Sequence, residues 1–162
     1  MTELGGMNRR PQPGRPIQPK GRASRAPDTR APSVPRPTAY RTESSLRPEL
    51  FDAEAREEAD RWRKVKSSQL RRFFGAVTGF VRRLDLDQAM TDQDAEVSMA
   101  LQKASATYAA ARSADHAPIR DFFEHHARLV KTRQDYRDFT RHFEAVVAYH
   151  KALASENSSR EG

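Results

Sequence analysis

The chain has 162 residues, a net charge of +7, ten prolines and no cysteine. This length fits one ordinary domain. The absence of cysteine excludes disulfides, thiolate zinc sites and cysteine nucleophiles, and it agrees with a reducing compartment, so we expect a cytoplasmic protein. No apolar run reaches the ~18 residues that a membrane span needs, and residues 1–10 lack the apolar segment of a secretory signal.

The first 41 residues carry the whole net charge. They contain nine Lys/Arg and two acidic residues, whereas residues 42–162 hold 20 of each kind. Eight of the ten prolines also lie here, and large apolar side chains are few. Such a segment buries too little surface to offset about 1–2 kcal/mol of backbone entropy per residue. We predict a disordered, basic Pro/Arg-rich tail over residues 1–45, which either attracts RNA weakly or has no specific role.

Beyond the tail, apolar residues recur at spacings of three and four, which predicts an all-α fold. A first helix is expected over residues 49–64, with acids in its opening turn and bases in its last, as the helix dipole favours. Ser67 or Ser68 caps a second helix, which ends at Leu84 and has the clearest amphipathic pattern. The apolar stripes are Phe51, Ala55, Trp62 and Val65 in the first helix, and Leu70, Phe73, Phe74, Val77, Phe80, Val81 and Leu84 in the second.

Three further helices follow a polar stretch at residues 85–94. The third is rich in alanine, which permits close helix packing, and it stops before Asp115. Pro118 opens the fourth helix, because proline is well tolerated in a first turn. Thr132 with Asp135 resembles the capping box that starts a fifth. The apolar positions are Val97, Leu101, Ala104, Tyr108 and Ala111 in the third helix; Ile119, Phe122, Phe123, His126, Leu129 and Val130 in the fourth; and Tyr136, Phe139, Phe143, Val146, Val147 and His150 in the fifth.

These elements predict a single compact bundle of about five helices over residues 46–155, followed by a disordered C-terminus at residues 156–162. A domain of about 110 residues hides roughly two thirds of its unfolded surface. That burial suffices for one core without a metal or a disulfide.

Five histidines raise the question of a metal site, which their spacing disfavours. His142 and His150 lie too far apart along a helix to share one ion, and the adjacent His125 and His126 point about 100° apart. We expect His126 and His150 to be hydrogen-bonded core groups and the other three histidines to be solvated. No HExxH, phosphate-binding glycine loop or GxSxG elbow is present, so we predict no catalytic residue, metal or cofactor. The enzyme alternative would be built on His142, Glu144 and His150.

The second helix carries a basic face. At 100° per residue, Arg71 and Arg82 lie within about 20° of each other, and Arg72 and Arg83 follow about 100° further round, away from the apolar stripe. No acidic residue occurs over residues 67–84, so these charges are not neutralised within their own helix. An unpaired basic strip attracts phosphate, which predicts a surface that contacts RNA or a partner.

Two glycines share that basic face. Gly75 and Gly79 fall between the arginine pairs, where each costs about 1 kcal/mol of helix propensity relative to alanine. One functional reason for this cost is that the glycines leave a groove without side chains, which a nucleic-acid backbone or a partner helix can approach closely. The alternative is an exposed helix that tolerates them. A weaker basic ridge of Arg133, Arg137 and Arg141 is expected to be mostly a solvated face.

Three sequence blocks resemble one known family. They are Ser68-Gln69-Leu70-Arg71-Arg72-Phe73-Phe74, then Tyr108-Ala109-Ala110-Ala111-Arg112, then Phe139-x-x-x-Phe143-Glu144-Ala145-Val146-Val147-Ala148-Tyr149-His150-Lys151. In content and in order they are similar to the small subunit of the type III-A (Csm) CRISPR effector complex. The resemblance covers roughly residues 50–153.

The resemblance implies a helical protein without a catalytic site, copies of which flank the duplex of guide RNA and target RNA while larger backbone subunits cleave the target. The implied partners are CRISPR guide RNA, target RNA, and backbone and other small subunits, in antiviral defence; self-association stays open. A helical protein–protein scaffold without direct RNA contact is the alternative. By matching position, Arg71, Arg72, Arg112 and Lys151 become candidates for contacts to RNA phosphates or neighbouring subunits. Together with the arginine face, the predicted RNA-binding set is Arg71, Arg72, Arg82, Arg83, Arg112 and Lys151.

Overall fold

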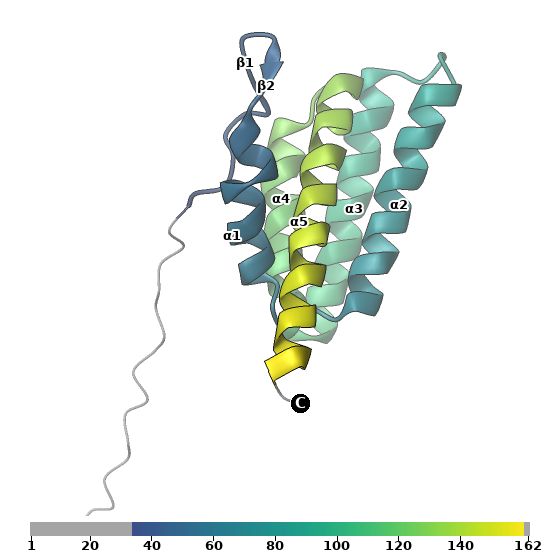
Figure 1. The fold of residues 1–162 in the computed structure, drawn as a ribbon. Helices are drawn as coiled ribbons and strands as arrows, with labels where there is room; N and C mark the ends of the chain where they lie inside the picture. The colour runs from purple at the N-terminus through teal and green to yellow at the C-terminus, as the bar shows by residue number, and fades with distance from the viewer. Residues whose placement is uncertain (1–33, 161–162) are drawn as a thin grey trace, which may run out of the picture. The chain divides into compact units, whose positions relative to one another are not determined.

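The computed structural model describes residues 34–160 and, for side chains, residues 34–156. Over this range five α-helices form one bundle, which confirms the predicted fold class (Figure 1). The predicted tail up to residue 33 lies outside the described residues. The helices are α1 Ala53–Arg61, α2 Ser67–Leu86, α3 Asp92–Arg112, α4 Ala117–Leu129 and α5 Arg133–Arg160, with 3₁₀ turns η1 Pro48–Phe51 and η2 Ala114–His116 and strands β1 Arg41–Thr42 and β2 Ser45–Leu46.

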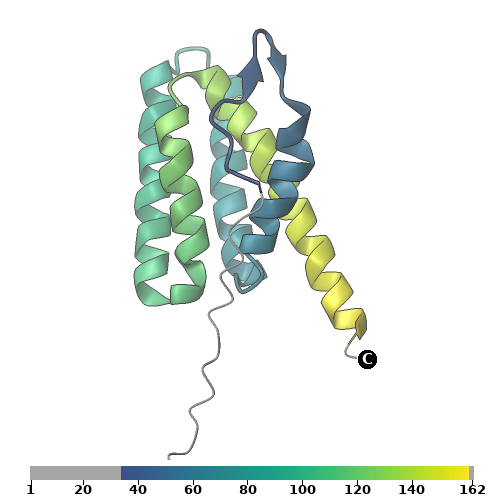
Figure 2. The same cartoon turned by 90° about the vertical axis from the view of Figure 1, so that its left-hand side faces the viewer.

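Helix α5 is the central element of the bundle. It contacts α1, α2 and α3, while α3 packs most extensively on α4. Figure 2 shows α3 and α4 side by side, with α5 crossing the bundle at an angle to them. Among the helices of residues 34–160, none combines the length and the apolar character needed to cross a bilayer.

The core is dominated by aromatic side chains. Trp62 is fully buried, with ring centroids 5.0 Å from Phe122 and 5.8 Å from Phe143. Phe139 stacks on Phe143 at 5.9 Å. The predicted stripes of α2, α4 and α5 face this core, as their helical spacing indicated. Four of their members lie at its edge and are only partly buried: Phe74, Val81, Leu129 and Val147.

The first two helices begin differently from their predictions. Instead of one helix over residues 49–64, the chain forms η1 and α1, separated at Asp52, whose φ of −126° and ψ of −94° are not helical. Neither Ser67 nor Ser68 is the cap of α2: Lys66 occupies that position and makes no side-chain capping bond. The serines therefore lie in the first turn of the helix.

Helix α3 exposes the apolar residues that were expected to form its stripe. Val97, Leu101 and Tyr108 are 51%, 62% and 61% exposed. Short side chains allow α3 to lie close against α4, so the larger apolar groups remain on the opposite side. A capping box of Thr91 and Asp94, with Thr91 N–H donating to Asp94 Oδ2 at 2.7 Å, starts this helix. Its buried residues are Ala95, Ser98, Met99, Ala106 and Ala109.

The folded unit begins earlier than the predicted boundary at residue 46. Residues 34–47, called the strap from here on, lie against the bundle and include the hairpin of β1 and β2. Tyr40 is buried and its hydroxyl is 2.7 Å from His126 Nδ1. At the other end, α5 continues to Arg160, past the predicted boundary at residue 155.

Ion pairs fasten the strap. Arg41 Nε donates to Asp138 Oδ2 at 2.5 Å, and the Asp138 side chain is fully buried. Arg36 binds both carboxylate oxygens of the buried Glu58, each at 2.9 Å. Arg36 and Arg41 belong to the segment that was predicted to be a free basic tail. In the structure their charges are neutralised by carboxylates of the bundle. The three pairs are Arg36–Glu58, Arg41–Asp138 and Arg47–Glu54.

Candidate nucleic-acid interface

The four arginines of α2 are exposed, as their helical positions predicted. Among the described residues none of Arg71, Arg72, Arg82 and Arg83 forms an ion pair; Arg83 lies over the ring of Phe80, 5.5 Å from its centroid. The two pairs are separated by eleven residues, or about 16 Å along the helix. The strip therefore presents unneutralised positive charge over the length of α2.

Other arginines of the bundle behave differently. Arg61 binds Glu58 at 2.6 Å, Arg128 binds Glu124 at 3.3 Å, and Arg120 binds Asp121 at 2.6 Å. These three arginines each have an acidic partner, unlike the four arginines of α2. The absence of acids from residues 67–84 is the sequence feature that leaves the α2 strip unpaired.

Arg71 and Lys151 line the same pocket, although 80 residues separate them in the sequence. The pocket measures about 420 Å³ and lies between the first turns of α2 and the C-terminal half of α5. Ser67 and His150 also line it, over an apolar wall that includes Phe74. No sequence pattern pointed to Ser67 or His150 as neighbours of a basic site, because their proximity arises only from the packing of α5 on α2.

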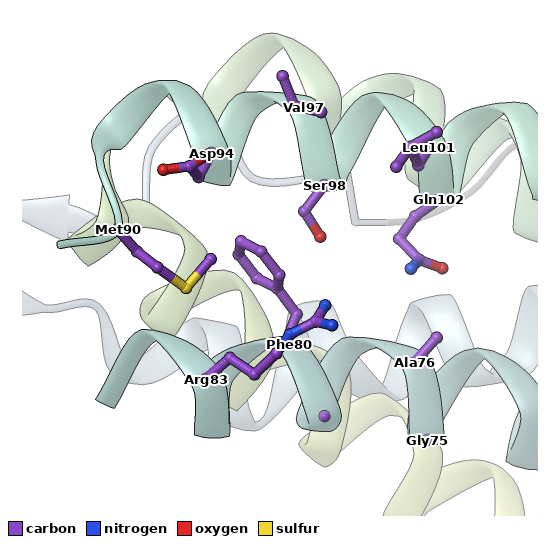
Figure 3. A pocket seen from close by; sticks show the side chains of 11 residues that line it. Gly75, Ala76, Phe80, Arg83, Met90, Asp94, Val97, Ser98, Leu101 and Gln102 are labelled. Carbon is purple, nitrogen blue, oxygen red and sulfur yellow. The ribbon is translucent and has the colours of Figure 1, made fainter. Parts of the chain in front are cut away.

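Arg83 belongs to a second cavity, the groove between α2 and α3. This groove measures about 470 Å³. Figure 3 shows Phe80 and Arg83 on α2, with Ser98 and Gln102 pointing toward them from α3. The two glycines form part of the α2 wall, and a Cβ added at Gly75 or at Gly79 would meet nothing within 4 Å. The space beside both glycines is therefore open, which fits both predicted alternatives: a groove for a close partner and an exposed helix that tolerates glycine.

Arg112, the remaining predicted residue, lies apart from the α2 strip. It is in the last turn of α3, exposed, with its guanidinium 5.7 Å from the centroid of the Tyr108 ring. No ion pair of Arg112 or Lys151 occurs among the residues that the structure describes. All six predicted cations are thus solvent-accessible, and the structure brings Arg71 and Lys151 together.

The weaker ridge on α5 is partly engaged in holding α2. Arg137 Nε donates to Asp85 Oδ1 at 2.9 Å, and Arg133 and Arg137 each reach the carbonyl of Leu84 at 3.4 Å. Arg141 is exposed. Two of these three arginines therefore bind the C-terminal end of α2.

The histidines are packed as core and connecting groups. His126 and His150 are buried and hydrogen-bonded as expected, but His142 is also buried, so its predicted solvation is wrong. His142 Nδ1 lies 2.7 Å from the Leu50 carbonyl, and His150 Nε2 lies 3.1 Å from the Trp62 carbonyl. Burial, reinforced by His142, holds the pKa of His126 well below 6.5.

Glu144 is exposed, whereas His142 and His150 point to separate backbone carbonyls. The three groups of the enzyme alternative therefore do not converge. Within residues 34–156, no group of three or more His, Asp or Glu side chains is placed to hold a metal ion.

Comparison with known proteins identifies the family. A family model described as Csm2 Type III-A matches residues 45–156. No curated protein and no solved structure matches the chain. The helical fold and this match define a small subunit of a type III-A CRISPR effector complex, which confirms the resemblance seen in the three sequence blocks. More particularly, the chain belongs to the Csm2 family, whose members are structural subunits that assemble with the other subunits of that complex. The strap up to residue 44 lies outside the matched region.

Proposed function

We propose that this subunit binds the backbone of guide and target RNA in the assembled effector complex, in cytoplasmic antiviral defence. The α2 strip and Lys151 neutralise phosphates, while base pairing between guide and target supplies the sequence specificity. The subunit itself reads no bases and catalyses no step.

The observation that carries this proposal is the unneutralised strip on α2. Arginine side chains that lack an acidic partner attract polyanions, and contacts to phosphates require only charge and reach. The pocket shared by Arg71 and Lys151 supports a phosphate position at one end of the strip, where two cations from different helices face the same space. Arg72, Arg82 and Arg83 extend the positive surface along α2.

The salt dependence of RNA binding tests the proposal. If about four phosphates are engaged, the logarithm of the affinity for single-stranded RNA should fall with the logarithm of salt concentration at a slope near −3, since each phosphate contributes about −0.7. Fluorescence anisotropy with a labelled RNA of mixed sequence measures this slope. A flat salt response would refute the proposal.

Variants locate the contacts. The double variant Arg71→Ala/Arg82→Ala should reduce the slope to roughly half and weaken binding to all sequences equally, because phosphate contacts carry no sequence information. The control is Arg128→Ala, which removes an exposed arginine of α4 that pairs with Glu124. The unfolding free energy of both variants should lie within about 0.5 kcal/mol of that of the parent protein, since surface substitutions rarely cost more. Equal RNA binding by the two variants would contradict the assignment to α2.

The exposed apolar residues of α3 favour a second role in protein packing. A scaffold without direct RNA contact would remain in the effector complex after nuclease treatment. Copurification from the native host, with and without nuclease, separates this role from RNA binding. Guide RNA that crosslinks to α2 would support RNA binding. A complex without any such crosslink would support the scaffold role.

A further inference from the structure

The pocket between α2 and α5 has a buried floor and a charged rim. Leu70 and His150 line it and are only 3% and 6% exposed, so they form the floor. Arg71 and Lys151 line it as well and are exposed. Its volume of about 420 Å³ lies within the range of about 300–1,000 Å³ that is usual for small-molecule sites. The pocket is therefore large enough for more than a single phosphate group.

The rim of the pocket is suited to an anion. Arg71 and Lys151 form no ion pair among the described residues. Lys66 provides no side-chain cap at the start of α2, and within the described part of the chain the backbone N–H groups of Ser67 and Ser68 have no acceptor. The N–H groups of a helix N-terminus favour a negative charge, and here two cations from different helices reinforce that preference.

His150 adds a hydrogen-bond acceptor to the floor of the pocket. Its Nε2 lies 3.1 Å from the Trp62 carbonyl oxygen, which only accepts, so Nε2 carries the proton and donates. In the neutral ring Nδ1 is then an acceptor, and it has no partner among the residues that the structure describes. Buried polar side-chain atoms normally have a hydrogen-bond partner. The pocket therefore fits a ligand that brings a donor, such as a hydroxyl group, together with its negative charge.

Apolar side chains complete the wall. Leu70, Phe74 and Val147 line the pocket, and Phe74 and Val147 are only partly buried. A partly buried aromatic ring offers a nucleobase a surface for stacking. An internal phosphate of an RNA strand would use the two cations but would leave this wall uncovered. A terminal phosphate also carries a charge of about −1.5 to −2 at neutral pH, compared with about −1 for an internal one, and so matches the two cations better.

We propose that this pocket binds one nucleoside monophosphate. Arg71, Lys151 and the first turn of α2 hold the phosphate, the nucleobase lies against the wall that contains Phe74, and a ribose hydroxyl donates to Nδ1 of His150. The ligand is either a free nucleotide or the 5′-terminal nucleotide of an RNA strand, since both present the same groups. The inference rests on the proposed function and deepens it, because it assigns a ligand to the phosphate position at one end of the α2 strip.

Isothermal titration calorimetry tests the ligand on the full chain, freed of nucleic acid by nuclease and a high-salt wash. Adenosine 5′-monophosphate (AMP) should bind at least about tenfold more tightly than inorganic phosphate and than adenosine, because only the nucleotide engages both the cations and the apolar wall. Absence of AMP binding would overturn the proposal. Inorganic phosphate that binds as tightly as AMP would overturn it as well, since the pocket would then hold a phosphate alone.

Variants place the ligand in the pocket. Arg71→Ala and Lys151→Ala should each weaken AMP binding at least about tenfold, since each removes a hydrogen bond from a charged group. The control is Arg141→Ala, which removes an exposed arginine of α5 outside the pocket and should leave AMP binding unchanged. Ala154→Phe fills the pocket from an exposed position and should abolish binding, whereas Ala152→Phe, exposed on the same helix but not lining the pocket, should not. AMP binding that survives Ala154→Phe would overturn the assignment to this pocket.

Short RNA strands separate the two sources of the nucleotide. If the ligand is a strand end, a 5′-phosphorylated RNA should bind more tightly than its 5′-hydroxyl counterpart, and AMP should compete with it. If the ligand is a free nucleotide, the two strands should bind equally. The salt slope of RNA binding is measured separately on the same protein. A slope near −3 without AMP binding overturns only the pocket ligand, whereas AMP binding with a flat slope overturns only the proposed RNA binding by α2.

Discussion

Removal of the Arg41 side chain is the sharpest test of how the strap is held. Asp138 has a fully buried side chain and accepts hydrogen bonds from Arg41 Nε at 2.5 Å, Arg41 Nη2 at 3.1 Å and Gln134 Nε2 at 2.9 Å. In Arg41→Met the carboxylate keeps only the amide of Gln134. The substitution therefore leaves a buried charge without a counter-ion.

The size of the effect follows from burial. Removal of one partner of a buried pair costs about 3–5 kcal/mol. The Arg41 side chain is 35% exposed, so water can reach part of the vacated space, and we expect the lower end, about 3 kcal/mol. Asp138→Asn should cost less, about 1–2 kcal/mol, because the unpaired Arg41 can turn into solvent. For a domain of this size, about 3 kcal/mol lowers the melting temperature by roughly 10 °C.

Equilibrium unfolding in urea, followed by fluorescence of the single tryptophan, measures these differences. Trp62 is fully buried, so its emission reports the loss of the core. The double variant Arg41→Met/Asp138→Asn should be more stable than Arg41→Met, because it removes the orphaned charge. Arg128→Met, from an exposed pair, should cost less than about 1 kcal/mol. The reasoning fails if Arg41→Met is no more destabilising than Asp138→Asn.

Three further outcomes are expected. Phe143→Ala should cost about 3–5 kcal/mol in the same urea assay, because Phe143 is fully buried among aromatic rings, and a loss below 1 kcal/mol would contradict its core position. Gly79→Ala should raise the unfolding free energy by about 0.5–1 kcal/mol, since helix propensity improves and the new Cβ meets no atom within 4 Å; destabilisation would show a contact closer than that. Burial lowers the pKa of both His126 and His142, so the unfolded chain binds more protons below pH 6.5. The unfolding free energy should therefore fall as the pH drops below 6.5, by at most about 1.4 kcal/mol per histidine per pH unit, until the pH reaches the folded pKa of that histidine; equal urea midpoints at pH 7.5 and 5.5 would rule this out.

Helical periodicity was a sufficient guide where large apolar residues form the buried face. In α2, α4 and α5 the aromatic and branched side chains form the core, as their spacing predicts. The same angular positions around α2 predict that its arginines are exposed. In α3 most of the buried residues are small: Ala95, Ala106 and Ala109 have short side chains, and Ser98 lies 3.2 Å from the Tyr136 hydroxyl of α5. Periodicity of large apolar groups therefore pointed to the wrong side of this helix.

The strap was missed for a different reason. Its residues are bound by partners far away in the sequence: Arg36 by Glu58, and Arg41 by Asp138, 97 residues on. A composition rich in proline and arginine occurs both in a free tail and in a segment bound by buried carboxylates, so it does not distinguish the two. The pocket of Arg71 and Lys151 has the same origin, since it arises from the packing of two helices and no local pattern encodes it.

Arginine thus occurs in two environments in this fold, and ionic strength should act differently on them. The strap pairs end on carboxylates that are shielded from solvent, such as Asp138 and Glu58, and mobile ions screen such pairs weakly. The arginines of α2 face solvent, where screening acts over about 10 Å at 0.1 M salt. Rising salt should therefore weaken RNA binding steeply while the urea midpoint stays nearly constant. A parallel loss of both would mean that the strap pairs are solvated, and that salt does not distinguish them from the arginines proposed to bind RNA.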